Sequence, residues 1–91
     1  MTISRSASIS PSAVISEGTR IGEGAYIGAN VYIGTGVYIG EGASILNGAY
    51  VGGGVDIGAG ATIEAGIRVG AGAHIRAGKY IGIDVREGET R

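Results

Sequence analysis

The chain carries a branched aliphatic residue at every sixth position along nearly its whole length. Counted from Ile3, fourteen consecutive positions of this series are Ile or Val, and no insertion interrupts the period. They are Ile3, Ile9, Ile15, Ile21, Ile27, Ile33, Ile39, Ile45, Val51, Ile57, Ile63, Val69, Ile75 and Ile81. A repeat of fixed length is the signature of a solenoid, in which each unit packs on its neighbours.

A second patterned position follows four residues after each aliphatic residue and is mostly Ala or Val. In the stretch "AYI", Ala25 and Ile27 therefore flank Tyr26. Residues two apart in a strand point to the same face, so the first and third residues point inward and the middle one outward. Each hexad is thus predicted to contain one short strand with an exposed central residue.

The other half of each hexad has the residue types of a tight corner. Glycine fills the fourth position ten times, as at Gly18, Gly24 and Gly36, and Asn30 and Asp84 occupy it elsewhere. Gly, Asn and Asp tolerate positive φ best. A helix is disfavoured, because each interior glycine costs about 1 kcal/mol. Short strands joined by corners fit every hexad.

This pattern, from Ile3 to Arg86, resembles the hexapeptide-repeat superfamily, whose units read [Ile/Leu/Val]-[Gly/Ala/Glu/Asp]-x-x-[small]-x. The resemblance implies an all-β fold, a left-handed parallel β-helix of triangular cross-section in which residues eighteen apart stack. Fourteen hexads then give a little under five coils without inserted loops. We expect one domain over residues 1–91, with the repeat register at 3–86 and a charged C-terminal tail at 87–91.

With this stacking, the outward residues form three columns. The first holds Ser8, Tyr26, Ser44, Thr62 and Tyr80, the second Val14, Tyr32, Tyr50, Arg68 and Arg86, and the third Arg20, Tyr38, Asp56 and His74. Tyr and Arg are enriched at interface hot spots. Because the resemblance also implies trimers, we predict that the second column is the contact of a homotrimer. The alternative is that Tyr simply suits an exposed strand.

The C-terminal end of the repeat departs from the regular pattern. Lys79 breaks the inward pattern in the incomplete last coil, and its stem is expected to cover the open end while its amine reaches water. The terminal sequence "REGETR" places charges beside the same end, which discourages edge-to-edge stacking.

The charge and residue composition exclude several classes of binding partner and of catalytic site. The 91 residues are 44% hydrophobic, carry a net charge of −1 and include no Cys. A nearly neutral chain offers no basic field for nucleic acid, and a chain without Cys has no disulfide, thiolate metal site or Cys nucleophile. The N-terminus lacks the apolar core of a signal peptide, and no stretch approaches the roughly 18 apolar residues of a membrane span. A cytoplasmic protein with neither a nucleic-acid nor a membrane partner is expected.

The only catalytic candidate is His74, with Asp56 one coil below it in the third column. The resemblance implies acyltransferases that use coenzyme A or acyl carrier protein, and a His general base that a carboxylate or carbonyl orients. Three features depart from that pattern. His74 lies in the middle of a strand, Ile75 rather than an acidic residue follows it, and no inserted loop or added domain builds an acceptor pocket.

The resemblance extends to γ-class carbonic anhydrases, which bind zinc through three His. One His per chain reproduces that set only if three copies meet at a trimer axis, so we predict no metal and no cofactor. The leading hypothesis is a self-associating structural β-helix without catalysis of its own. The alternative is an acyltransferase dependent on coenzyme A or acyl carrier protein, or a fragment of one, with its site between subunits.

Overall fold

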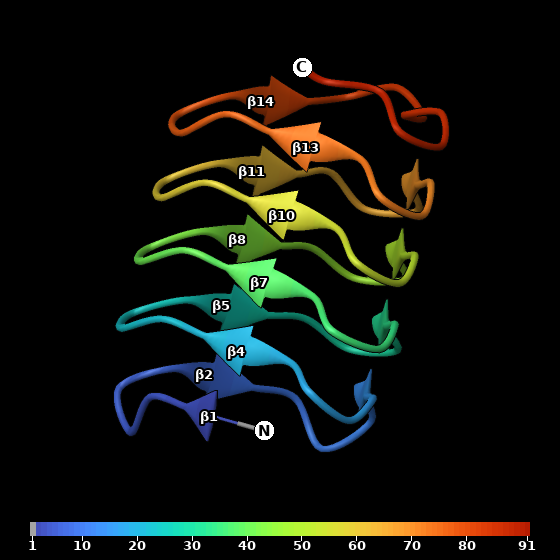
Figure 1. The fold of residues 1–91 in the computed structure, drawn as a ribbon. Coiled ribbons are helices and arrows are strands. Elements are labelled where there is room, and N and C mark those ends of the chain that lie inside the picture. The colour runs from blue at the N-terminus through green and yellow to red at the C-terminus, as the bar shows by residue number, and fades with distance from the viewer. Residues whose placement is uncertain (1) are drawn as a thin grey trace.

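A computed structural model describes residues 2–91, which form fourteen two-residue strands at a constant interval of six residues (Figure 1). The strands are β1 (Thr2–Ile3), β2 (Ser8–Ile9), β3 (Val14–Ile15), β4 (Arg20–Ile21), β5 (Tyr26–Ile27), β6 (Tyr32–Ile33), β7 (Tyr38–Ile39), β8 (Ser44–Ile45), β9 (Tyr50–Val51), β10 (Asp56–Ile57), β11 (Thr62–Ile63), β12 (Arg68–Val69), β13 (His74–Ile75) and β14 (Tyr80–Ile81). The constant interval confirms that no loop is inserted between the strands.

Every third strand belongs to the same parallel sheet. Sheet A has the order β1-β4-β7-β10-β13, sheet B has β14-β11-β8-β5-β2, and sheet C has β12-β9-β6-β3. Ile39 pairs with Ile21 on one side and with Ile57 on the other, so residues eighteen apart stack directly. Figure 1 shows the coils rising from the N-terminal to the C-terminal end. The predicted parallel β-helix is confirmed, and it is consistent with the left-handed winding that the resemblance implied.

The aliphatic columns fill the interior of the prism. Ile39 and Ile57 are fully buried, whereas the outward-pointing Tyr38 between the corners is 47% exposed. Thr19 is the one buried polar residue among those the structure describes, and its hydroxyl lies 2.9 Å from the Ser16 carbonyl oxygen. The alternation of buried and exposed positions confirms the inward and outward assignment made from the sequence.

The glycine corners adopt the conformation that their sequence position predicted. All ten glycines at the fourth place of a hexad have positive φ, for example 71° at Gly36, and Asn30 has a φ of 60°. The expectation fails at Asp84, since Asn30 is the only non-glycine with positive φ in the described part of the chain. Gly88, with a φ of 67°, takes the last corner instead.

This difference arises because the last turn is shortened by two residues. Val85 pairs with Val69, and Thr90 with His74, at separations of sixteen residues rather than eighteen. In the regular register Glu87 would lie inside the prism above Val69, and burial of an unpaired carboxylate is very costly. The shift places Val85 in the core instead, where it is 3% exposed.

The shortened turn corrects the expected stacking of Arg86 on Arg68. Arg86 does not stack on Arg68, because the residue that pairs with Val69 is Val85 and Asp84 therefore lies above Arg68. The residues at the very end bond to β13: the His74 N–H donates to the Glu89 carbonyl at 2.8 Å, and the Arg91 N–H donates to the His74 carbonyl at 2.9 Å. Lys79, at an inward position in the sequence pattern, is exposed.

Candidate functional site

Sheet A carries the titratable pair that the sequence singled out. His74 pairs with Asp56 across β13 and β10, and His74 Nδ1 lies 3.2 Å from Asp56 Oδ2. With the proton on Nδ1, the imidazole donates to the carboxylate and leaves Nε2 free to accept a proton from a substrate. The two side chains are 51% and 47% exposed, so one copy of the chain leaves the pair open to water.

The backbone of His74 is held from both sides. β10 lies below it, and the last turn lies above it through the hydrogen bonds to Glu89 and Arg91. The turn is itself closed by an ion pair, in which Arg91 Nε lies 2.7 Å from Glu89 Oε2. This bond and an N–H donated by Arg86 lower the pKa of the Glu89 carboxyl. The sequence did not predict this support, because it depends on the shortened register.

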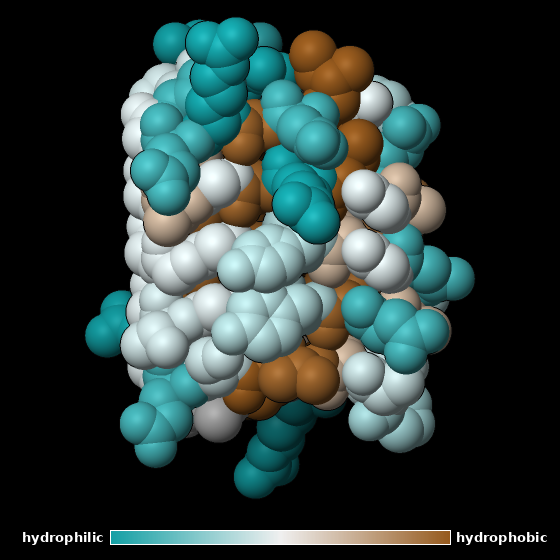
Figure 2. Space-filling view, turned by 90° about the vertical axis from the view of Figure 1, so that its right-hand side faces the viewer, coloured by the Kyte–Doolittle hydropathy of each residue, from teal (hydrophilic) through white to brown (hydrophobic). Residues whose placement is uncertain are grey.

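Sheet C presents the aromatic stripe. Tyr32 and Tyr50 pair across β6 and β9, and their rings stack with centroids 5.0 Å apart and planes 26° from parallel. Val14, one coil lower, is 55% exposed. Figure 2 shows the two rings one above the other, with a hydrophobic patch beneath them. Stacking confirms the column Val14, Tyr32, Tyr50, Arg68; its role as a subunit contact stays a prediction.

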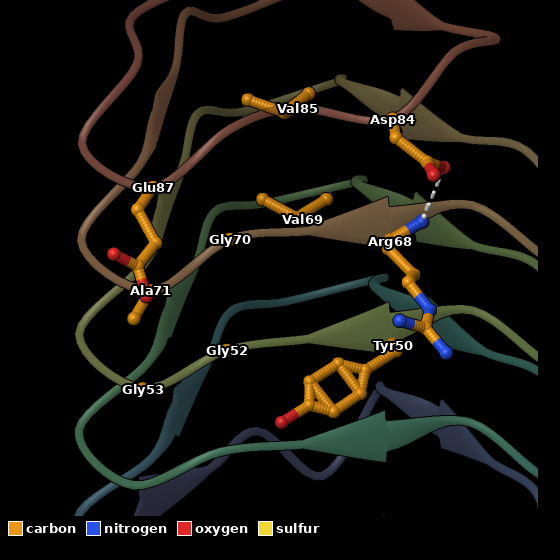
Figure 3. Close-up of a pocket in the computed structure, with 10 residues that line it drawn as sticks. All are labelled: Tyr50, Gly52, Gly53, Arg68, Val69, Gly70, Ala71, Asp84, Val85 and Glu87. Carbon is orange, nitrogen blue, oxygen red and sulfur yellow. Dashed lines mark hydrogen bonds between the residues drawn. The ribbon is translucent and has the colours of Figure 1, made fainter.

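A groove of about 520 Å³ lies above the stacked tyrosines, towards the corner that joins sheet C to sheet A. It is lined by Tyr50, Gly52, Gly53, Arg68, Val69, Gly70, Ala71, Asp84, Val85 and Glu87. In Figure 3 the Arg68 side chain extends down towards Tyr50, while Glu87 lies on the other side of the small residues. Asp84 accepts a hydrogen bond from the Arg68 backbone N–H at 3.0 Å.

The hexad pattern does not predict this groove. Gly52, Gly53 and Ala71 leave the corner without large side chains, and that much is legible in the sequence. Asp84 and Glu87 enter only because the last turn is shortened, so no pattern of hexads places them there. Arg68 therefore has Asp84, rather than a second arginine, as its neighbour in the next turn.

Residues 2–91 contain neither a metal-binding cluster nor a membrane-spanning helix. The structure contains no cluster there of three or more His, Cys, Asp or Glu side chains arranged to hold a metal ion. The same residues include no helix with the length and apolar character that crossing a membrane requires.

Comparison with known proteins gives one family and several solved structures. The model of the family described as bacterial transferase hexapeptide (six repeats) matches residues 1–35 and 36–66. No curated protein sequence matches the chain. The acetyltransferase domain of PglB from Neisseria gonorrhoeae FA1090 is 28% identical; its structure matches with a TM-score of 0.64, and its complex with acetyl coenzyme A with 0.65.

The matches cover nearly all of this chain but only about half of each solved structure. Each PglB structure covers 97% of this chain, which spans 52% of the PglB domain. A mutant of perosamine N-acetyltransferase from Caulobacter crescentus, in complex with CoA and GDP-perosamine, is 23% identical with a TM-score of 0.54 and supports the fold alone. That match covers 92% of this chain and 51% of the other. The chain thus spans about half the length of these solved structures.

Proposed function

Because the chain belongs to the bacterial transferase hexapeptide-repeat family, we propose that it is the β-helix part of a coenzyme A-dependent acyltransferase. The observation that carries this proposal is the contact of 3.2 Å between His74 and Asp56, which has the geometry of a general base and its orienting carboxylate. The 28% identity to an acetyltransferase domain solved with acetyl coenzyme A supports the same class.

The roles of the two residues follow from their hydrogen-bonding capacity. His74 Nε2 accepts the proton of an acceptor hydroxyl or amine as that group attacks the thioester carbonyl carbon. Asp56 holds the imidazole through Nδ1 and stabilises the imidazolium that forms. The acyl donor supplies an activated thioester, and its sulfur leaves with the bonding electrons when the carbon–sulfur bond breaks. The proton held by His74 then passes to the departing thiolate.

The donor site is proposed to lie between neighbouring copies. His74 and Asp56 are half exposed on a flat face, and the groove beside Arg68 is bordered by Asp84 and Glu87. Neither feature by itself encloses a thioester or surrounds a nucleotide with positive charge. A neighbouring prism packed against this one would exclude water from the pair and complete the site.

The contact between copies is proposed to be the stripe of Val14, Tyr32 and Tyr50 with Arg68, in a homotrimer. Support comes from the exposure of this stripe, 55% at Val14 and 40% at Tyr32, on an otherwise regular sheet. The double variant Tyr32→Glu/Tyr50→Glu should sediment as a monomer, because each copy would bring two carboxylates into a buried contact. A trimer that persists in this variant would overturn the assignment.

Acetyl coenzyme A binding and acyl transfer test the enzymatic proposal. We expect saturable binding by calorimetry, and turnover with a panel of amine and hydroxyl acceptors in an assay for released thiol. His74→Ala should lower turnover about 100-fold or more, and Asp56→Asn should lower it less while donor binding persists. Tyr38→Phe, in the same outward column, is the matched control and should leave turnover unchanged.

The second candidate is the self-associating scaffold without catalysis. The open setting of His74 and Asp56 favours it, because water is not excluded from the pair within one copy. Absence of saturable acetyl coenzyme A binding in an assembled trimer would decide for the scaffold. Binding that His74→Ala leaves intact, together with no turnover for any acceptor, would do the same.

A further inference from the structure

The corner between β8 and β9, in the middle of the prism, contains the chemically reactive pair Asn47–Gly48. In such a pair the Gly48 backbone nitrogen attacks the Cγ carbonyl carbon of Asn47, because glycine has no side chain to shield that nitrogen. A succinimide ring closes as the side-chain nitrogen leaves as ammonia with the proton of the Gly48 N–H. Water then opens the ring at either carbonyl and gives aspartate or isoaspartate. Asn47 is exposed, so water reaches this corner.

The folded corner holds the pair in a type II turn. Gly48 has a φ of 75°, and Asn47 has a negative φ, since Asn30 is the only non-glycine with positive φ in the described part of the chain. The turn is closed by the Ala49 N–H, which donates to the Leu46 carbonyl at 3.2 Å. A type II turn fixes ψ of its second residue at about 120°. Ring closure requires the Gly48 nitrogen on the same side of the Cα–C bond as the Asn47 Cβ, and this ψ turns the nitrogen away.

The coil below ties both reacting groups to one residue. The Gly48 N–H donates to the Ala29 carbonyl at 2.9 Å, and Asn47 Oδ1 accepts from the Ala29 N–H at 2.9 Å. The Asn47 side chain fits over this coil because residue 28 is a glycine, and a Cβ on Gly28 would collide with Oδ1. Rotation into the reactive geometry breaks at least one of the two bonds, since they hold groups on both sides of the Cα–C bond.

We propose that Asn47–Gly48 is a spontaneous deamidation site whose rate is set by the opening of this corner. The pair is unreactive while the coils are stacked, and each separation of the corner from Ala29 permits ring closure. The aspartate product keeps an oxygen in the place of Oδ1, so it can restore the bond to the Ala29 N–H. Isoaspartate adds one methylene to the backbone and no longer fits the constant spacing of eighteen residues. Deamidation therefore records coil opening, and its isoaspartate product leaves a permanent defect in the prism.

The composition of the chain makes the reaction simple to follow. Asn30 and Asn47 are its only Asn residues, and it contains no Gln. Asn30 precedes the β-branched Val31, which shields the backbone nitrogen, so Asn30 is the internal reference. Cleavage after glutamate separates residues 24–41 from residues 42–64, and each Asn then lies in its own peptide. Mass spectrometry of the two peptides measures the deamidated fraction at each Asn.

The first experiment compares the folded 91-residue chain with the same chain unfolded in guanidinium chloride, at one pH and temperature. We expect Asn47 to deamidate at least about tenfold more slowly in the folded chain, because only the opened fraction reacts. Asn30 should stay unmodified over the same period in both states. Equal rates at Asn47 in the two states would overturn the proposal, as would faster modification at Asn30 than at Asn47.

The second experiment removes one of the two bonds. Ala29→Pro deletes the N–H that holds Asn47 Oδ1, and the backbone accepts it, because proline suits the second position of a turn and Pro11 has that position one coil below. The folded variant should deamidate at Asn47 about three- to tenfold faster than the original chain. Ala65→Pro is the matched control: it makes the same change at this corner one coil above, where the N–H forms no hydrogen bond within residues 2–91.

The control should leave the rate at Asn47 unchanged, and equal acceleration by the two proline variants would contradict the assignment. The comparison of folded and unfolded states does not require either variant to fold. As a further readout, Asn47→Asp should retain the urea midpoint of the original chain, whereas the purified isoaspartate form should unfold at lower urea. Equal midpoints for these two forms would contradict the predicted backbone defect.

Discussion

In the middle of the prism each strand has a neighbour above and below, while the last turn has a neighbour only below. The middle strands keep the eighteen-residue stacking without exception, as Ile21, Ile39 and Ile57 show. The last turn keeps the core column but not the spacing, because Val85 replaces Glu87 above Val69. Burial of an apolar residue therefore takes precedence over the length of the repeat where only one neighbouring coil fixes the register.

The same comparison bears on the candidate site. His74 lies on β13, the last strand of sheet A, and its backbone bonds link the regular coils to the shortened turn. The groove beside Arg68 likewise combines regular strands with residues of that turn. Both features therefore depend on where the regular stacking ends.

The largest expected effect is a loss of unfolding free energy, and it differs between the middle coils and the last turn for the same Val→Ala substitution. Val51 and Val85 belong to the same core column, and they are fully buried and 3% exposed respectively. Val51→Ala should lower the free energy of unfolding by about 2–3 kcal/mol, because coils on both sides hold the cavity open. Val85→Ala should cost about 1 kcal/mol, since the last turn can settle onto the smaller residue. Urea denaturation measures both, and equal losses would contradict the comparison.

An intermediate effect is expected from adding one methyl group to a glycine. A Cβ at Gly40 would lie 2.6 Å from the backbone nitrogen of Ala59, so neighbouring coils would have to separate. Gly40→Ala should cost about 1–3 kcal/mol of unfolding free energy. At Gly82 the nearest atom to such a Cβ is the end of the Glu64 side chain at 3.4 Å, and Gly82→Ala should change stability by less than about 0.5 kcal/mol. Thermal unfolding of the two variants distinguishes them.

The smallest effect is acid loosening of the last turn. The pKa of Glu89 is lowered by the hydrogen bonds from Arg91 and Arg86, so its ionised form favours the folded turn. This contribution is fully present above the ordinary value of 4.5 and disappears as pH falls through the lower pKa of the folded chain. Below pH 4.5 the amide of Arg76, which donates to the Arg91 carbonyl, should therefore exchange faster.

Amide exchange followed by NMR checks this prediction, with the Tyr50 amide in the middle of sheet C as the internal reference. In the Glu89→Gln variant, the Arg76 amide should exchange at a rate that does not depend on pH once the rate is corrected for intrinsic exchange. High salt should reduce the difference in acid sensitivity between the original chain and the variant, because the ion pair between Arg91 and Glu89 is partly exposed. Equal acid sensitivity of the variant and the original chain would assign the effect to another group.

The regular part of this protein follows from its amino-acid pattern alone. A branched aliphatic residue every six positions, with glycine at the corners, defined the strands, the inward and outward faces and the columns from Ile3 to Ile81. It also brought His74 above Asp56, because a constant spacing of eighteen residues leaves one position for each side chain. Periodicity is sufficient here since every unit meets identical neighbours.

Packing sets the arrangement of the last turn, where that symmetry ends. The exclusion of Glu87 from the core shortens the last turn, moves Arg86 away from Arg68, supports His74 from above and completes the groove. None of these features follows from the hexad pattern. Each depends on whether burying the Glu87 carboxylate costs more free energy than shifting the register of the last turn by two residues. The hexad pattern defines the repeat, but only the packing of the last turn shows that Val85, rather than Glu87, has the lower free energy above Val69.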